Sequence, residues 1–276
     1  MRLATIRTAT GNRAVRVDAT AAVETGEADV RALLERPDWA AHAANAAGPS
    51  HPLEGLDYAP LVPSPEKIIC VGLNYRDHVR EMGHEMPDYP TLFAKYAPSL
   101  VGAYDDIVLP RVSEKIDWEV EFTVVIGRPV RHATPEQAEA AIAGYTVLND
   151  VSVRDYQSRT SQFLQGKTFE KTTPLGPWLV TPDEVPDGGL EVTTVVDGET
   201  LQSSSTAELV FNPVDLVVYL STIMTLNPGD VIATGTPGGV GHARKPPRYL
   251  TDGAKVVTTV AGVGECRNTC RLEPMP

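Results

Sequence analysis

Two acidic residues near the middle of the chain, Glu119 and Glu121, have the spacing of ligands on a β-strand. Residues i and i+2 of a strand point to the same face, so the two carboxylates project side by side. The apolar, β-branched run over 122–126 that follows them is typical of a buried strand. Like charges held together near a core are costly unless a cation lies between them. The pattern therefore favours a metal site over an exposed strand end with two solvated acids.

Asp150 is the candidate for a third ligand, because it ends a strand-like run over 144–148. Taken alone, Asn149-Asp150 is typical of a turn or a helix cap. Together with Glu119 and Glu121 it forms an all-oxygen set with no histidine or cysteine close by in the sequence. Such a set suits Mg²⁺, Mn²⁺ or Ca²⁺ rather than zinc.

His78 and Glu81 lie three residues apart on a short helix predicted within 74–83, so they share a face. A carboxylate beside an imidazole raises its basicity and sets its tautomer, as a water-activating general base requires. The same spacing also fits an exposed helix with an incidental ion pair. The spacing alone does not separate the two interpretations.

Lys167, which follows Gly166, is a candidate for neutralising a substrate carboxylate or a developing enolate, although a surface lysine has the same local sequence. Arg154 and Gln157 follow Asp150 closely and can face an anionic ligand. The glycine-rich stretch 234–241 lets backbone N–H groups approach a ligand oxygen. It lacks the spacing of a dinucleotide-binding fingerprint.

The elements around these residues predict two parts. Strands over 2–7 and 13–18, a helical stretch over 28–46 interrupted by Pro37, and a proline-rich linker predict a small amino-terminal domain over 1–65. The sequence predicts that the remainder, 66–276, is the main domain. Its short apolar runs are separated by turns and lie at 67–72, 91–95, 107–109, 190–196, 231–234 and 255–260, with helices over 134–143 and 216–222. Many strands and few long helices predict a mixed, β-rich fold.

The bulk composition limits the partners. The 276 residues include 36 acids and 24 bases, a formal charge of −12, which argues against a nucleic-acid or anionic-membrane partner. A local basic pocket can still bind a small anion. The amino terminus has no apolar signal core and no run reaches transmembrane length, so we expect a cytoplasmic protein.

Taken in order, these motifs resemble those of the fumarylacetoacetate hydrolase family over about residues 66–264. The segments that carry the resemblance are Cys70-Val71-Gly72-Leu73-Asn74-Tyr75 with His78 and Glu81, Glu119-Val120-Glu121, Asn149-Asp150-Val151-Ser152-Val153-Arg154-Asp155, Gly166-Lys167-Thr168-Phe169, Gly176-Pro177-Trp178, Pro228-Gly229-Asp230-Val231-Ile232 and Gly235-Thr236-Pro237-Gly238-Gly239-Val240-Gly241. Small departures are Ser152-Val153 where alanine is usual before the arginine, and Tyr96 where proline often follows the lysine. The ligand set is intact, so these departures concern the identity of the substrate.

The resemblance implies a β-sandwich roll with short helices and a divalent metal, usually Mg²⁺, held by Glu119, Glu121 and Asp150. It makes Lys167 the cation that orients the substrate. It also implies a homodimer, and the amino-terminal 65 residues weakly resemble a small, variable α/β domain of bacterial members.

In the same family, His78 and Glu81 are implied to be the water-activating pair on a mobile lid. Candidate contacts to the substrate are Tyr75, Arg154, Gln157 and Thr236. The implied reaction is hydrolysis of the C–C bond of a small anionic diketo acid, such as fumarylpyruvate or a similar acylpyruvate, to pyruvate and a carboxylic acid. The alternatives are a decarboxylase or isomerase of a 2-oxo or 2-hydroxydienoic diacid, and a non-catalytic metabolite-binding protein.

Overall fold

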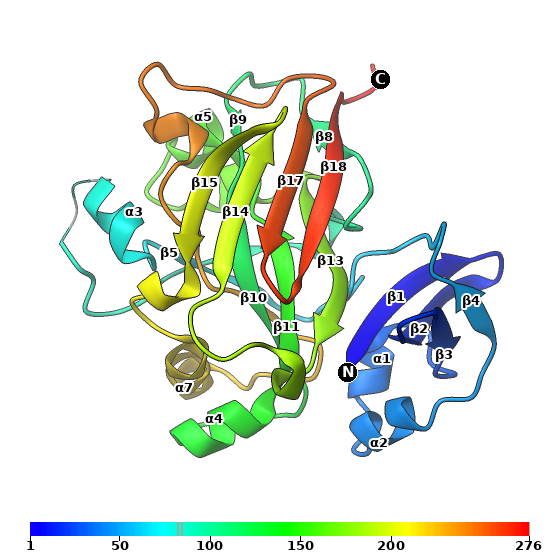
Figure 1. Cartoon of the computed structure of the whole chain (residues 1–276). Helices are drawn as coiled ribbons and strands as arrows, with labels where there is room; N and C mark the ends of the chain where they lie inside the picture. The colour runs from blue at the N-terminus through cyan, green and yellow to red at the C-terminus, as the bar shows by residue number, and fades with distance from the viewer. Residues whose placement is uncertain (82, 84, 276) are drawn as a thin grey trace.

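A computed structural model gives the conformation of residues 1–81, 83 and 85–275. Two β-sheets pack face to face and short helices lie at their edges (Figure 1). This architecture confirms the β-rich mixed fold predicted from the sequence.

The larger sheet has eleven strands. In spatial order they are β4 (Ser50–Pro52), β3 (Ala21–Glu24), β2 (Gly11–Val17), β1 (Arg2–Thr8), β13 (Thr173–Val180), β11 (Ile142–Asn149), β10 (Val120–Ile126), β16 (Val231–Ala233), β5 (Ile68–Gly72) and β6 (Thr91–Lys95), with β7 (Leu100–Val101) beside β13. The smaller sheet has the order β15 (Glu199–Ser205), β14 (Glu191–Val196), β17 (Lys255–Val260), β18 (Gly264–Leu272) and β8 (Ile107–Leu109). A separate pair joins β9 (Ile116–Asp117) to β12 (Ser152–Val153).

The helices are short. They are α1 (Val30–Leu34), α2 (Trp39–Ala44), α3 (Arg76–Glu81), α4 (Pro135–Ala141), α5 (Arg154–Gln157), α6 (Leu164–Lys167) and α7 (Pro213–Ile223), with 3₁₀ turns at Ala97–Ser99, Pro182–Glu184, Thr206–Glu208 and Gly241–Ala243. None of the helices in the described part of the chain is both long and apolar enough to cross a membrane.

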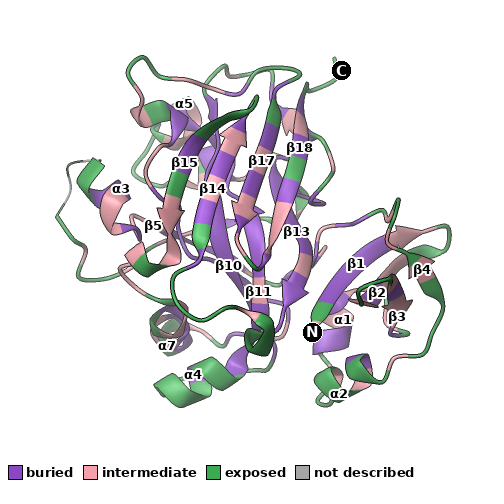
Figure 2. Cartoon of the chain, viewed as in Figure 1, coloured by how far each residue is buried: buried purple, intermediate pink, exposed green. Residues whose placement is uncertain are grey.

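The central strand β10 is buried along its whole length, because β11 and β16 flank it and the smaller sheet covers one face (Figure 2). Its apolar residues Val120 and Phe122 pack with Val192 and Val260 of the smaller sheet. Residues on the other face, including Val125, pack in a second cluster. The carboxylate of Glu121 is therefore held in the interior by a strand whose other side chains are mostly apolar.

Local sequence explains several element boundaries. Pro37 interrupts the helical stretch predicted over 28–46, which forms α1 and α2 instead of one helix. Thr134 and Gln137 form a reciprocal capping box at the start of α4. The helix predicted within 74–83 is α3, and residue 82 lies outside the described residues.

The amino-terminal strands extend the larger sheet, because β1 pairs with β13 with Leu3 opposite Leu179. Leu33 and Leu61 belong to the same apolar cluster as Leu175 and Leu179. In Figure 1 the segment from β1 to β4 lies to one side of the two-sheet body, with α1 and α2 beside it. The division of the chain at residue 65 stays a prediction.

Candidate active site

The three predicted ligands meet at one end of β10 and β11. Glu119 precedes β10, Glu121 lies on it, and Asp150 follows β11. Because these strands are antiparallel, the end of β11 returns to the start of β10, and the Asp150 N–H donates to the Glu119 carbonyl at 2.8 Å. One carboxylate oxygen of each residue lies within 4.8 Å of the others, and all three residues are buried. This triad can hold a divalent cation.

Two buried lysines and an arginine surround the triad. Lys167 Nζ donates to Glu119 Oε2 at 2.5 Å and to Asp150 Oδ2 at 2.7 Å. Lys95 Nζ donates to Asp150 Oδ1 at 2.7 Å, and Arg154 NH2 lies 2.7 Å from Glu119 Oε1. Such close pairing is needed because an unpaired charge at this depth would be strongly disfavoured.

The two glutamates respond to this environment in opposite directions. Burial raises the pKa of Glu119, but Lys167 and Arg154 outweigh it and hold the pKa at about 2. Burial, Asp150 and Glu119 all raise the pKa of Glu121 well above its usual value. A backbone N–H, that of Gly235, donates to Glu121 Oε2 at 2.7 Å. Glu121 is therefore the ligand with the least compensated charge.

The donor set fits a divalent cation. The carboxylates of Asp117, Glu119, Glu121 and Asp150 carry four negative charges when ionised, whereas the cations paired with them, Lys95, Lys167 and Arg154, carry three positive charges. The excess of one negative charge is placed where three carboxylate oxygens converge. All-oxygen sets of this kind suit Mg²⁺, Mn²⁺ or Ca²⁺.

Two residues of the triad, Glu119 and Glu121, line the base of a cavity of about 280 Å³, close to the lower end of the usual size of small-molecule sites. Glu119, Glu121, Arg154 and Lys167 line its buried base. Apolar side chains form much of the wall, and Ser158, Thr160 and His242 lie exposed at its mouth; the apolar residues are Val71, Leu73, Phe93, Phe163 and Val240. With a divalent cation held by the triad, the cavity can therefore accept a small molecule with an anionic end at the base.

His78 and Glu81 are in contact on α3. His78 Nδ1 lies 3.1 Å from Glu81 Oε2, and the Gly239 N–H donates to Glu81 Oε1 at 3.2 Å. The carboxylate favours the tautomer with the proton on Nδ1, so Nε2 is the nitrogen that remains as a base. His78 itself lines the cavity.

Thr236 and Gln157 line the same cavity with hydrogen-bond donors available. Thr236 Oγ1 accepts from Gln202 Nε2 at 2.9 Å, so its own O–H can donate elsewhere. Gln157 Oε1 accepts from Arg154 NH1 at 2.9 Å, which sets the amide orientation and leaves its NH₂ group as a donor.

Two residues predicted to contact the substrate have other surroundings. Arg154 lines the cavity, but Nε donates to Asp117 Oδ2 at 2.8 Å and NH2 lies against Asp117 and Glu119. Its guanidinium is thus already paired with two carboxylates, although NH2 meets them at ion-pair distance without hydrogen-bond geometry. Tyr75 is fully buried in the apolar cluster of Val120 and Phe122 and does not line the cavity. This position does not fit a direct contact between Tyr75 and the substrate.

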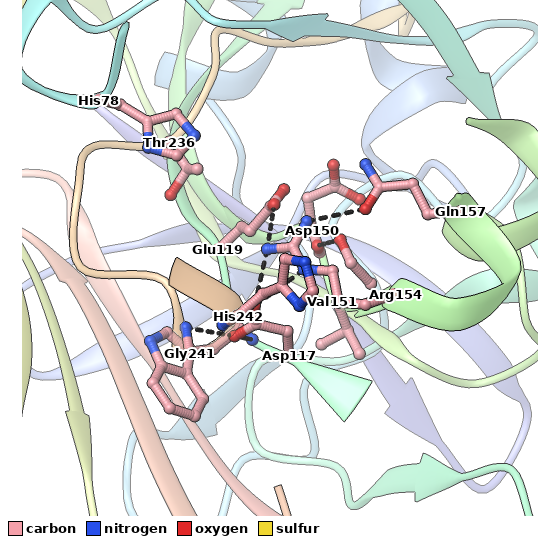
Figure 3. Close-up of polar contacts among 12 residues, drawn as sticks. His78, Asp117, Glu119, Asp150, Val151, Arg154, Gln157, Thr236, Gly241 and His242 are labelled. Carbon is pink, nitrogen blue, oxygen red and sulfur yellow. Dashed lines mark hydrogen bonds and ion pairs between the residues drawn. The ribbon is translucent and has the colours of Figure 1, made fainter. Parts of the chain in front are cut away.

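Asp117, Lys95 and His242 belong to the site, although the sequence did not single them out. Asp117 accepts from the backbone N–H groups of Gly241 at 2.7 Å and His242 at 2.9 Å, and from Arg154, so it connects the loop after β16 to Glu119 (Figure 3). Asp117 lies two residues before Glu119, and this i, i+2 spacing is a signal that could have identified it. Lys95 ends an ordinary strand, and its sequence carries no comparable signal.

The fold and the site define a β-rich enzyme whose carboxylate triad can hold a divalent cation at the base of a cavity. Residues 67–271 match the family model described as fumarylacetoacetate (FAA) hydrolase, C-terminal. The chain is 45% identical over 219 residues to the human protein named oxaloacetate tautomerase FAHD2A, mitochondrial. This alignment covers 78% of this chain and 70% of that protein. The chain belongs to the fumarylacetoacetate hydrolase family, as its motifs predicted.

Solved structures agree over the whole chain. Fumarylacetoacetate hydrolase from Exiguobacterium antarcticum has a TM-score of 0.88 at 31% identity and covers 99% of this chain. The 5-carboxymethyl-2-hydroxymuconate delta-isomerase from Mycobacterium smegmatis has a TM-score of 0.83 at 33% identity and covers 100% of this chain. Each match covers 100% of the other chain. The names of these similar proteins include a hydrolase, a tautomerase and an isomerase, so membership of the family does not select the reaction.

Proposed function

We propose that this protein is a divalent-metal-dependent enzyme that interconverts the keto and enol forms of a small 2-oxo acid. The observation that carries the proposal is one cavity with Glu119, Glu121 and Lys167 at its base and His78, paired with Glu81, on its wall. Asp150 completes the carboxylate triad with the two glutamates. Similarity at 45% identity to proteins named oxaloacetate tautomerase supports this reaction and makes oxaloacetate the first substrate to test.

Each residue of the site has a separate role in the proposed reaction. When bound to Glu119, Glu121 and Asp150, a divalent cation, with Mg²⁺ as the first candidate and Mn²⁺ or Ca²⁺ as alternatives, supplies Lewis acidity toward the carboxylate and 2-oxo group. His78 takes a proton from carbon 3 through Nε2 while Glu81 stabilises the imidazolium. The electron pair of that C–H bond forms the C2–C3 double bond. Lys167 stabilises the negative charge that develops on the 2-oxo oxygen. This oxygen then takes a proton from solvent to give the enol, and the His78 imidazolium returns its proton to solvent.

Hydrolysis of an acylpyruvate is the second candidate, because the His78–Glu81 pair is also suited to activate a water. A base with a fixed tautomer can deprotonate a water as readily as a carbon acid. Attack of that water on the distal carbonyl would break the C–C bond and release pyruvate and a carboxylic acid. Decarboxylation or isomerisation of a 2-oxo or 2-hydroxydienoic diacid would use the same base and lysine. A protein that only bound a metabolite would not need the His78–Glu81 pair.

Product analysis with the full chain and Mg²⁺ tests these reactions. Oxaloacetate and a panel of acylpyruvates are followed by enol absorbance, by coupled detection of pyruvate and by release of CO₂. We expect faster decay of the enol signal of oxaloacetate, with no net products. Formation of pyruvate and a carboxylic acid in equal amounts would show that the enzyme is a hydrolase and not a tautomerase. Release of CO₂ would indicate a decarboxylase. Absence of turnover despite tight Mg²⁺ binding would contradict the enzymatic proposal.

The predictions about partners and location remain proposals. We propose a homodimer, measurable by light scattering, and no nucleic-acid or membrane partner, in line with the net charge of −12. Several relatives carry the word mitochondrial in their names, whereas we propose a cytoplasmic location for this chain.

A further inference from the structure

The mouth of the cavity carries an imidazole that the proposed reaction does not use. His242 lies in the 3₁₀ turn Gly241–Ala243 and lines the same cavity as Gln157 and Thr236. It is exposed, whereas Glu119 and Glu121 at the base are buried. A ligand whose first carboxylate lies at the base therefore directs its far end toward His242.

The backbone and ring of His242 are both held in place. Asp117 accepts the backbone N–H groups of Gly241 and His242, one on each carboxylate oxygen, at 2.7 and 2.9 Å. Asp117 is fully buried and is itself paired with Arg154. The hydroxyl of Tyr249 lies 3.0 Å from His242 Nδ1. An exposed side chain with this many restraints is preorganised for a contact.

The Tyr249 hydroxyl can donate to His242 Nδ1 or accept from it, and the direction determines what the ring can offer a ligand. A phenol that donates to Nδ1 leaves the proton on Nε2, which then is a donor. Burial, and after it the charge of Arg154, lower the pKa of His242, which favours this neutral ring. Gln157 has a free NH₂ group nearby on the cavity wall, and Ser158 and Thr160 add hydroxyl groups at the mouth.

The acidic side chains that line the cavity, Glu119 and Glu121, are both at its base. Among the described residues, its outer part therefore combines hydrogen-bond donors with no lining carboxylate, a composition that matches an anionic oxygen group. An alkyl end would leave these donors without a partner once water is displaced.

We propose that His242, oriented by Tyr249 and assisted by Gln157, recognises the distal carboxylate of the substrate, so that the chain selects 2-oxo diacids over 2-oxo monoacids. The inference rests on the proposed function for the position of the first carboxylate at the base. It adds the residue that determines specificity at the other end.

Binding of matched acids to the full chain with Mg²⁺ tests the proposal. Calorimetry compares 2-oxoglutarate with 2-oxopentanoate and 2-oxoadipate with 2-oxohexanoate, pairs that differ only in the distal carboxylate. We expect wild type to favour the diacid of at least one pair by roughly tenfold or more, since a hydrogen bond to a charged group contributes that much. His242→Ala should reduce this ratio by about tenfold, and His242→Gln, which keeps an N–H donor, should restore part of it.

Tyr249→Phe is the matched variant for orientation, because it keeps the aromatic ring and removes only the hydroxyl. We expect it to lower the diacid preference less than His242→Ala does, with monoacid affinity unchanged. Equal affinity of wild type for both members of every pair would overturn the proposal, as would an unchanged ratio in His242→Ala or failure of wild type to bind any of the acids.

Turnover separates this proposal from the proposed function. If the wild-type protein is a tautomerase and His242→Ala keeps the preference for diacids over monoacids, only the role of His242 is overturned. A second outcome combines two results: His242→Ala loses the preference for diacids over monoacids, and the wild-type protein shows no tautomerase, hydrolase or decarboxylase activity. This outcome would support the carboxylate site and overturn the proposed function. Thermal unfolding of each variant checks its fold, which we expect to be intact because His242 is exposed.

Discussion

Glu121 has the least compensated charge among the residues of the site. Burial and the neighbouring carboxylates of Asp150 and Glu119 raise its pKa, whereas Glu119 itself is paired with Lys167 and Arg154. A cation placed among these oxygens would compensate Glu121 most. Substitution of Glu121 therefore tests the metal dependence of the site.

We expect Mg²⁺ to raise the melting temperature of the wild-type chain and not that of Glu121→Gln. Ligand at a hundred times its Kd adds about 2.7 kcal/mol to the free energy of unfolding, which for a chain of this size is a rise on the order of 5–10 °C. Glu121→Gln should also be at least as stable as wild type in EDTA, because it removes a buried like charge. Glu139→Gln, at an exposed position of α4, is the control. Equal Mg²⁺ shifts in wild type and Glu121→Gln would contradict the assignment.

The raised pKa of Glu121 also sets the sign of a pH dependence. In EDTA the folded chain binds more protons than the unfolded chain between the ordinary glutamate pKa and the raised one, so this residue's contribution to stability falls as pH rises through that window. Mg²⁺ needs the ionised carboxylate, so its affinity should rise over the same window. Unfolding in EDTA and Mg²⁺ titration at several pH values measure both slopes. Glu121→Gln should flatten them, and a wild-type affinity independent of pH would contradict this prediction.

His78→Ala should lower the turnover number by about 10² to 10⁴ while Mg²⁺ affinity is retained, because a general base is lost and no ligand is removed. Steady-state kinetics and calorimetry measure the two quantities. His51→Ala, in β4 and away from the cavity, is the matched histidine control. Full activity of His78→Ala would exclude this residue as the base.

At the scale of elements, the site depends on segments that Asp117 and Gly235 connect. Asp117 is the last residue of β9, two positions before Glu119, and it accepts two backbone N–H groups from the loop after β16. Gly235 has φ of +104°, and a Cβ there would lie 2.9 Å from the Val71 carbonyl of β5. Only glycine allows this loop to approach Glu121 so closely.

We expect Asp117→Asn to destabilise the chain by roughly 3–5 kcal/mol, because it removes one of the two carboxylates paired with the buried Arg154 and the one that accepts from its Nε. Denaturant unfolding measures the loss. Asp155→Asn, in helix α5 and only partly buried, is the control. A loss below about 1 kcal/mol would show that Glu119 and Gln157 suffice to hold Arg154.

At the scale of the whole molecule, the amino-terminal segment and the main body share one apolar cluster. Leu3, Leu33 and Leu61 pack in the same cluster as Leu175 and Leu179, and β1 is hydrogen-bonded to β13. Regions that share a core are expected to unfold together.

Leu33→Ala should therefore lower the free energy of unfolding by about 2–5 kcal/mol and shift the melting of the entire chain as one transition. Calorimetry, with near-ultraviolet circular dichroism as a second probe, measures this. The exposed neighbour Glu35 provides the control Glu35→Ala, which should change stability by less than about 0.5 kcal/mol. Separate transitions for the two regions would favour the independent domain predicted over 1–65.

Strands with a clear apolar pattern were predictable, whereas others were not. The runs at 67–72, 91–95 and 255–260 coincide closely with β5, β6 and β17. The strands β13 and β18 escaped prediction, because β13 contains glycine and two prolines and β18 is rich in polar residues. Their pairing with β11 and β17 outweighs these local preferences.

The sequence by itself determined the chemistry of the triad, because the i, i+2 spacing of Glu119 and Glu121 places both carboxylates on one face of any strand. It also determined the contact of His78 with Glu81, which lie one helical turn apart. Only the tertiary structure decided that Lys95 and Asp117 belong to the site and that Tyr75 belongs to the core. Local spacing is set by the geometry of one element, whereas these contacts depend on how distant strands and loops pack.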